Sequence, residues 1–385
     1  MRIAFIGCGY VADFYRQTLH NHPGLELVAV MDRDAARAER FAAFHRVPKV
    51  STLREVLDDR RVQLVVNLTN PDSHYEVSRA ALLAGKHVYS EKPLAMSIDH
   101  AEELVALARS KGLRIAGAPC SVLGESAQTA WRALRSGAIG EVRLAYAELD
   151  DGPVHLMGCE AWRSSSGAPW PAKDEFEVGC TLEHAGYYVT WLAAFFGPVR
   201  EVTSFAGTLV PDKGVAVDRI TPDFTVACLQ HGSGVVSRVT CSIYAPHDHE
   251  LAIMGDRGVL RVDECWNYGS PVRVSGRTGL GLRAEKHPRA AALVGMGPRR
   301  LPLARKPRFA FKTRGANVMD FARGVAEVAD AIREARPARL SPEFSLHVNE
   351  VVLAIQGGRG GDADRGATRR MSTTFDPIPP MPWAM

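Results

Sequence analysis

Two patterns of hydrophobic and polar positions divide the chain. In the first third, apolar runs at 2–6, 25–31, 62–67, 86–89 and 113–117 alternate with segments in which apolar residues recur at helical spacing. Unbroken apolar runs of this length are typical of strands that are buried on both faces of a parallel sheet. Strand–helix units repeated in this way predict a parallel sheet with right-handed crossovers.

The pattern changes further along the chain. Shorter segments of alternating apolar and polar residues are separated by glycine-containing turns, at 199–205, 224–230, 235–244, 249–254, 258–262 and 272–274. A period of two predicts the strands of an antiparallel sheet. Helical spacing predicts helices over 180–196, 317–333 and 347–356.

The length of the chain indicates more than one domain. A chain of 385 residues is too long for one ordinary core, so we predict two domains, 1–121 and 122–385. The glycine- and charge-rich segment from 357 is predicted to be a flexible tail within the second domain.

Composition narrows the class of protein. It is 46% hydrophobic and 23% charged, which is typical of soluble globular proteins. No apolar run approaches the ~18 residues of a membrane span, and the N-terminus enters a strand without a signal-type segment, so we expect a cytoplasmic protein with no membrane partner. The 7 scattered cysteines form no C-x-x-C pair and predict free thiols. The net charge is +4, and the basic run 298–314 lacks a base-stacking pattern, so nucleic acid is not an expected partner.

The first strand runs directly into the sequence Gly-Cys-Gly-Tyr-Val-Ala at 7–12. In this spacing Gly7 allows a tight turn, Gly9 lets the backbone approach a pyrophosphate, and Ala12 keeps the helix close to the strand. The helix that Tyr10 and Val11 begin then points its N-terminus at the anion. Such a turn also occurs without a ligand, but its position in a predicted strand–helix unit favours a dinucleotide site.

The second strand ends at an acidic residue, Asp32, about 20 residues downstream, as the dinucleotide fingerprint requires. Its carboxylate can accept hydrogen bonds from the ribose hydroxyls and repel a 2′-phosphate, so it favours NAD over NADP. Arg33 is a complication, because a guanidinium there could tolerate the phosphate. The alternative is that Asp32 only caps the helix that begins near Ala35.

Polar residues also follow the next two strands. Ligands of parallel sheets bind at the carboxyl ends of the strands, so these residues are expected to contact the cofactor. They are Asn67, Thr69, Asn70, His74, Glu91 and Lys92.

Several motifs together resemble the Gfo/Idh/MocA oxidoreductase family. They are the glycine motif at 7–12, Asn-Leu-Thr-Asn-Pro-Asp-Ser-His at 67–74, Ala-Gly-Lys-His-Val-Tyr-Ser-Glu-Lys-Pro at 84–93, Ser-Gly-Ala-Ile-Gly at 136–140, and the pair Trp162 and Arg163. The resemblance implies an N-terminal Rossmann doubly wound parallel sheet, followed by a C-terminal α/β domain with a large open, mainly antiparallel sheet. It also implies a homodimer or homotetramer that forms through this second sheet.

The resemblance further implies that nicotinamide lies between the domains and that Lys92 points at the reacting hydroxyl. A lysine that is partly desolvated beside NAD⁺ has a lowered pKa and can relay a proton from an alcohol. The alternative is a surface ammonium before a turn proline.

The stretch 178–191 departs from the family pattern, which usually places Asp, Gly, His and Asp here. With Gly186 as anchor, His184 takes the first Asp position and Tyr188 takes the His position. If 180–196 is one helix, His184 and Tyr188 lie one turn apart on one face, so the imidazole could assist the phenol as a proton relay. Alternatively, both side chains only line the pocket. Glu183 is one residue out of register and is expected to face elsewhere, as a structural salt-bridge partner.

Two further features concern the substrate and metals. The indole of Trp162 can stack on a sugar ring and Arg163 can donate to hydroxyls, and the loop 164–172 that follows either closes over the substrate or is a surface excursion. His247 and His249 share one face of a strand without an obvious third ligand, so no metal is expected.

These features predict an NAD-dependent oxidoreductase. It would transfer hydride between nicotinamide and a secondary hydroxyl of a sugar, a sugar derivative or a cyclitol, with Lys92 and Tyr188 handling the proton and His184 assisting. Two alternatives stay open. One is an enzyme that retains NAD and uses transient oxidation for epimerisation or elimination, and the other is a non-catalytic NAD-binding sugar sensor.

Overall fold

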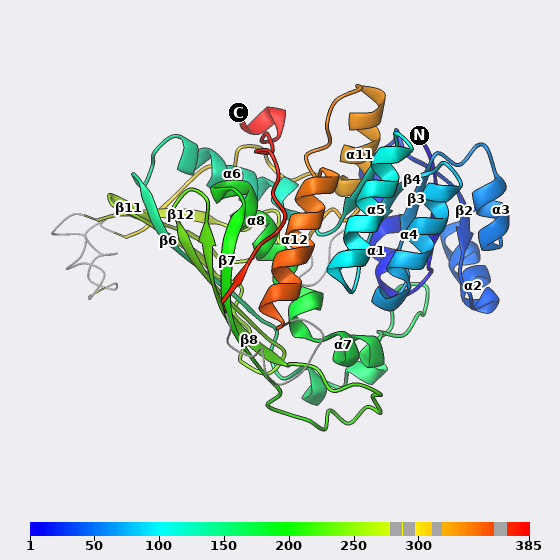
Figure 1. Ribbon diagram of the computed structural model, residues 1–385, viewed down its shortest axis with the longest axis horizontal. Coiled ribbons are helices and arrows are strands. Elements are labelled where there is room, and N and C mark those ends of the chain that lie inside the picture. The colour runs from blue at the N-terminus through cyan, green and yellow to red at the C-terminus, as the bar shows by residue number, and fades with distance from the viewer. Residues whose placement is uncertain (278–286, 288–296, 310–317, 358–367) are drawn as a thin grey trace.

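The computed structural model describes residues 1–277, 287, 297–309, 318–357 and 368–385. In Figure 1 the parallel sheet and its helices lie on the right and a larger sheet lies on the left, with helix α12 (Pro342–Ile355) between them. Two parts of the sequence predictions, the tail 358–367 and the basic residues 310–314, lie outside the described residues.

The N-terminal sheet is parallel, with the strand order β2-β1-β3-β4-β5. This confirms the predicted doubly wound sheet, because its strands coincide with the apolar runs. The strands are β1 (Arg2–Ile6), β2 (Glu26–Met31), β3 (Leu64–Asn67), β4 (His87–Ser90) and β5 (Ile115–Gly117). The helices are α1 (Tyr10–Thr18), α2 (Ala35–His45), α3 (Leu53–Asp58), α4 (His74–Leu83) and α5 (Ile98–Ser110).

Within the described residues, the second sheet has nine strands in the order β13-β12-β11-β10-β6-β9-β8-β7-β14, and it is mainly antiparallel, as predicted. Its central strand β6 (Val142–Asp150) pairs in parallel with β9 and is absent from the predicted strands, although it carries the same alternation. The others are β7 (Val199–Gly207), β8 (Phe224–His231), β9 (Val236–Ser242), β10 (Leu251–Gly255), β11 (Gly258–Val262), β12 (Val272–Gly276), β13 (Arg299–Arg300) and β14 (Thr368–Arg370).

The helix predicted over 180–196 consists of two different segments. A π-helical turn covers Thr181–Ala185, and α8 (Gly186–Phe196) continues from it. A π turn closes i→i+5 hydrogen bonds, so it rotates the following residues relative to a continuous α-helix. The remaining α-helices of this part are α6 (Glu125–Arg135), α7 (Ala172–Val178) and α11 (Arg323–Arg333). Short 3₁₀ turns cover Leu19–Asn21, Pro71–Ser73, Ser121–Leu123, Val154–Leu156, Cys159–Ala161 and Pro382–Ala384.

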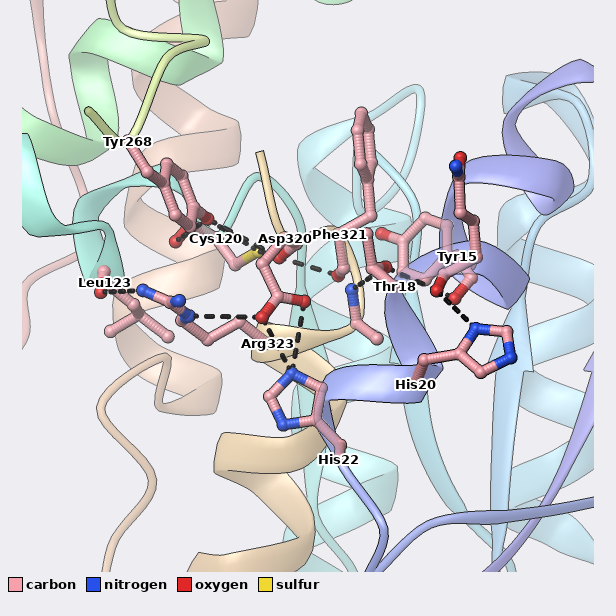
Figure 2. Close-up of polar contacts among 12 residues, drawn as sticks. Tyr15, Thr18, His20, His22, Cys120, Leu123, Tyr268, Asp320, Phe321 and Arg323 are labelled. Carbon is pink, nitrogen blue, oxygen red and sulfur yellow. Dashed lines mark hydrogen bonds and ion pairs between the residues drawn. The ribbon is translucent and has the colours of Figure 1, made fainter. Parts of the chain in front are cut away.

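The chain after residue 318 returns to the N-terminal sheet. His22 Nε2 lies 2.9 Å from Asp320 Oδ2, and the backbone N–H of Ala322 donates to Thr18 Oγ1 at 2.9 Å (Figure 2). The buried Arg323 donates to the Leu123 carbonyl at 3.1 Å. These contacts join segments that are far apart in the sequence. They hold in place residues 319–323, two of which line the cavity described below.

All seven cysteines are free thiols, as predicted. Among the residues that the structure describes, no helix combines the length and apolar character that a bilayer span requires.

Candidate active site

A cavity of about 550 Å³ is lined by residues of the N-terminal part, which contains the parallel sheet, and by residues of the part that contains the second sheet. We call the part at the first βα turn the cofactor end, with Gly7, Gly9, Tyr10, Val11, Asp32 and Arg33. We call the part that faces the second sheet the reacting end, with Lys92, Glu175, Glu183, His184, Tyr187 and Trp266.

The glycine turn at the cofactor end is shaped by its backbone. Gly7 has φ +100°, and a Cβ there would lie 2.3 Å from the Leu68 carbonyl oxygen, so only glycine fits. A Cβ on Gly9 would meet nothing within 4 Å, so this backbone is open to the cavity. Helix α1 begins at Tyr10 without a side-chain cap, which leaves its first amides free for an anion. The turn therefore fits a dinucleotide pyrophosphate, while Ala12 is buried in the core.

Asp32 is held by backbone amides at the end of β2. Its Oδ2 accepts from Cys8 N at 2.8 Å and its Oδ1 from Asp34 N at 2.9 Å. Each carboxylate oxygen has a second lone pair, so Asp32 keeps acceptor capacity for ribose hydroxyls. The alternative role as a helix cap is wrong, because Asp34 caps α2 by accepting from Arg37 N at 3.1 Å. Arg37 Nη1 also lies 3.6 Å from Asp32 Oδ2 and, like Arg33, lines the cavity.

The residues at the end of β3 and after it have two roles: some line the cavity, and one supports the turn from inside. Thr69, Asn70 and His74 line the cavity, as expected for cofactor contacts. Asn67 is fully buried and does not line it; its Nδ2 donates to the His74 carbonyl and to Ser78 Oγ, both at 3.0 Å. Thr69 Oγ1 donates to Asn67 Oδ1 at 2.7 Å, so Asn67 shapes the turn.

Lys92 reaches the reacting end, where its Nζ forms an ion pair with Glu183. Glu91 supports this position, since its Oε1 accepts from Tyr15 OH at 2.6 Å and its Oε2 from Lys92 N at 3.1 Å. Burial alone would lower the pKa of Lys92, but Glu183, Glu91 and Glu175 outweigh it, so this pKa is raised. This corrects the expectation of a lowered pKa: the sequence did not show the carboxylates around the ammonium.

Glu183 is therefore a salt-bridge partner, but it faces the cavity rather than elsewhere. Burial raises the pKa of its carboxyl to about 7; Lys92 acts against this shift and Glu175 adds to it. Burial thus brings the pKa of one carboxyl of the reacting end, that of Glu183, toward neutrality.

His184 lies between two carboxylates instead of beside Tyr188. Its Nε2 donates to Glu175 Oε1 at 2.5 Å, and its Nδ1 lies 2.7 Å from Asp151 Oδ2. Burial would lower the pKa of His184, yet Asp151 and Glu175 together raise it well above the usual value. His184 lines the cavity, and its raised pKa favours the imidazolium form.

The structure corrects the placement of Tyr188. This residue is fully buried, is absent from the cavity wall, and donates its hydroxyl to the His249 carbonyl. The physical reason is the π-helical turn, which brings Tyr187 to the wall instead. The ring of Tyr187 packs edge-on against Trp266, with the ring centroids 5.5 Å apart.

Neither Trp162 nor Arg163 lines the cavity, contrary to the expectation for the substrate site. Arg163 is exposed and donates to the carbonyls of Glu160 and Trp162, at 2.7 and 2.8 Å. Trp162 instead packs edge-on against Trp170, with the ring centroids 5.2 Å apart, and Trp170 lines the cavity. The loop 164–172 thus contributes to the wall.

Several lining residues were missed by the sequence analysis. Glu175 lies on α7, Trp266 lies in the segment after β11, and Phe321 lies in the segment before α11. These segments are distant in sequence and carry no motif, and the only local signal was the charge density around Glu175.

His247 and His249 lie behind the reacting end with Asp151, and their donor atoms come within 4.8 Å of one another. Both ring nitrogens of His249 already face carboxylates, Asp151 Oδ1 at 3.0 Å and Glu264 Oε1 at 2.8 Å. Ion pairs therefore account for this cluster within the described part of the chain.

Comparison with known families matches two successive stretches of the chain. Residues 1–117 match the oxidoreductase family with an NAD-binding Rossmann fold named after GFO, IDH and MocA, and residues 127–261 match the GFO/IDH/MocA C-terminal domain. The trans-1,2-dihydrobenzene-1,2-diol dehydrogenase of Mus musculus is 28% identical over 273 residues, which is 69% of this chain and 75% of that protein.

Solved structures share the fold over almost the whole chain. An NAD-binding oxidoreductase of Klebsiella pneumoniae superimposes with a TM-score of 0.73 at 24% identity, covering 98% of this chain and 99% of that one. An aldose–aldose oxidoreductase of Caulobacter crescentus superimposes with a TM-score of 0.74 at 18% identity, covering 96% and 99%.

Proposed function

The chain belongs to the Gfo/Idh/MocA family of NAD(P)-dependent oxidoreductases that act on CH–OH groups, and we propose that it exchanges hydride between NAD and a secondary hydroxyl of an uncharged ring polyol: a sugar, a cyclitol or a cyclic diol. The observation that carries this proposal is the placement of Lys92 and Glu183 in the same cavity as Gly9 and Asp32. Side chains that can transfer a proton and residues that can bind a dinucleotide thus line the same cavity.

The chain's own residues would hold the cofactor at the cofactor end. The amides after Gly9 would bind the pyrophosphate, and Asp32 would accept from the adenosine ribose. When bound, nicotinamide supplies the hydride chemistry.

The alcohol proton would pass through Lys92 to Glu183. The ammonium of Lys92 touches the Glu183 carboxylate, so it can give a proton to Glu183 as it takes one from the substrate hydroxyl. Because the pKa of Lys92 is raised, this residue already carries its proton and can only pass one on, whereas Glu183, with a pKa of about 7, can accept a proton near neutrality. Tyr187, on the same wall, would donate to the substrate oxygen.

An uncharged substrate is supported by the wall of the reacting end. Trp170, Tyr187 and Trp266 offer aromatic faces of the kind that pack against sugar and diol rings. In the described part of this wall the two cations, Lys92 and His184, are both paired with carboxylates, so neither is free for a substrate phosphate or carboxylate. The Mus musculus relative is named as acting on a cyclic diol.

Self-association through the nine-stranded sheet is a second part of the proposal. Phe205 on β7 and Val236 on β9 are 55% and 38% exposed, and large exposed apolar side chains favour an interface. Sedimentation of the purified protein would test it, and a monomer at micromolar concentration would contradict it.

The test of the proposed function is an assay with NAD and NADP against a panel of neutral polyols, cyclic diols, uronates and nucleotide sugars. We expect NADH to build up with a neutral ring substrate, and Asp32→Ala to lower the preference for NAD over NADP. Substrate conversion without net NADH would instead support the internal redox cycle of an epimerase or eliminating enzyme. Binding without any conversion would support the sensor and contradict the proposal.

A further inference from the structure

A row of alternating acidic and histidine side chains runs from the cavity wall to the ends of strands β6, β10 and β11 of the second sheet. His184 contacts Glu175 on the cavity side and Asp151 on the other, at 2.5 and 2.7 Å. Asp151 in turn contacts His249 at 3.0 Å, and His249 contacts Glu264 at 2.8 Å. We call these five residues the charge row.

Burial makes the charge row more than a set of surface ion pairs. The side chain of His249 is 0% exposed, that of Asp151 is 10% and that of His184 is 14% exposed. Surface pairs contribute little because water screens them, whereas buried charges depend on their partners. Asp151 Oδ1 hydrogen-bonds to His249 Nε2, and its Oδ2 lies within ion-pair distance of His184 Nδ1 without a hydrogen bond, so both imidazoles face this one carboxylate.

We propose that Asp151, held by His249 and Glu264, is a positioning residue that keeps His184 charged and turned toward Glu175, and thereby sets the pH range in which Glu183 accepts the substrate proton. This inference rests on the proposed function for the role of Glu183. Asp151 itself is not part of the cavity wall, so it acts through His184.

The titration behaviour agrees with this geometry. Burial would raise the pKa of Asp151, but His184 and His249 hold it well below the usual range. Burial would lower the pKa of His249, but Asp151 and Glu264 raise it to about 9. The charge of His184 is one of the influences that lower the pKa of Glu183, so loss of that charge would raise the Glu183 pKa further.

Other titratable groups face the charge row, among them His247, whose Nε2 lies 3.4 Å from Glu264 Oε2. Beyond the row itself, His184 faces the Trp266 ring, with Lys92 and Glu183 at the cavity side. His249 also faces the rings of His247 and Trp266, and Asp150 lies beside Asp151. Burial raises the pKa of Asp150 to about 7, and Glu148, Asp248 and Asp151 add to this shift while His249 opposes it.

Asp151→Asn is the informative substitution. An asparagine at 151 accepts from only one histidine and presents its amide N–H groups to the other, which must then be neutral. We expect ring ¹⁵N spectra of the cofactor-free protein to show His184 and His249 protonated at pH 7.5 in the wild type, and at least one of these two to lose its proton in D151N. We also expect the acid limb of kcat/KM to move up by roughly 1 pH unit.

His184→Asn provides the second variant, because it removes the same charge without touching Asp151. It should move the acid limb in the same direction, and D151N should add no further shift in the H184N background. Asp248→Asn is the matched control: this exposed aspartate is a near neighbour of His249 outside the charge row, and its substitution should leave both readouts unchanged.

An unchanged histidine spectrum and an unchanged acid limb in D151N would overturn the inference, and so would an unchanged limb in H184N. If the wild type lacked NAD-linked activity, the proposed function would fail separately, and the histidine spectra of D151N would still decide whether Asp151 holds His184 charged.

Discussion

The two ends of the cavity differ in the kind of chemical group that forms them. At the cofactor end the decisive atoms are backbone amides, a glycine with φ +100° and one carboxylate tied to amides. At the reacting end they are buried side-chain charges, Lys92 with Glu183 and His184 with Glu175. Substitutions at the first end should therefore change shape and affinity, and those at the second should change proton transfer and its pH dependence.

The largest expected effect separates the two ends most sharply. Lys92→Met should lower kcat by ~10²- to 10⁴-fold, because the proton relay is lost, while the NAD dissociation constant changes little. Steady-state kinetics and calorimetric NAD titration measure the two quantities. Lys173→Met is the matched control. Lys173 pairs with Asp218 at the surface, so its substitution should leave kcat and the NAD dissociation constant unchanged. A K92M enzyme with near-normal turnover would contradict the relay.

The same contrast explains how much the sequence could predict. Gly7 and Asp32 lie in a motif that records local backbone geometry, so the parallel sheet and the candidate cofactor residues could be predicted from short stretches, whereas the strand order was not predicted. The reacting end depends on one π-helical turn, which exchanges Tyr187 for Tyr188. It also depends on Glu175 and Trp266, which only the tertiary fold brings to Lys92, so periodicity alone could not identify them.

Two adjacent tyrosines of α8 allow a direct comparison between a side chain that lines the cavity and one that is buried in the core. Tyr187→Phe should lower kcat by about 10-fold or more without loss of stability, because Tyr187 lines the cavity and its hydroxyl is proposed to donate to the substrate. Tyr188→Phe should instead cost about 1–3 kcal/mol of unfolding free energy, because the buried His249 carbonyl loses its donor. Kinetics and chemical denaturation of both variants test this, and a slow but stable Y188F enzyme would return the catalytic role to Tyr188.

Two glycines test the cofactor end in the same way. Gly7→Ala should destabilise the fold by about 1–3 kcal/mol, since the residue would be strained and its Cβ would clash with the Leu68 carbonyl. Gly9→Ala has open space and should keep stability but weaken NAD binding by roughly 10-fold, because the methyl group would enter the pyrophosphate site. Thermal unfolding and NAD titration distinguish these outcomes; equal NAD affinity in G9A and wild type would place the pyrophosphate elsewhere.

The smallest expected effect is a change in the shape of the pH profile. Burial places the pKa of Glu183 at about 7, above the usual value for a glutamate, so the carboxylate is charged above pH 7 and protonated below it. A protonated Glu183 cannot accept from Lys92, so kcat/KM for alcohol oxidation should fall about tenfold per pH unit below 7. Glu183→Gln should lower the rate and remove this limb, whereas the exposed Glu160→Gln should keep it. Persistence of the limb in E183Q would assign it to another group, and the reacting end would then not owe its pH dependence to the Lys92 pair.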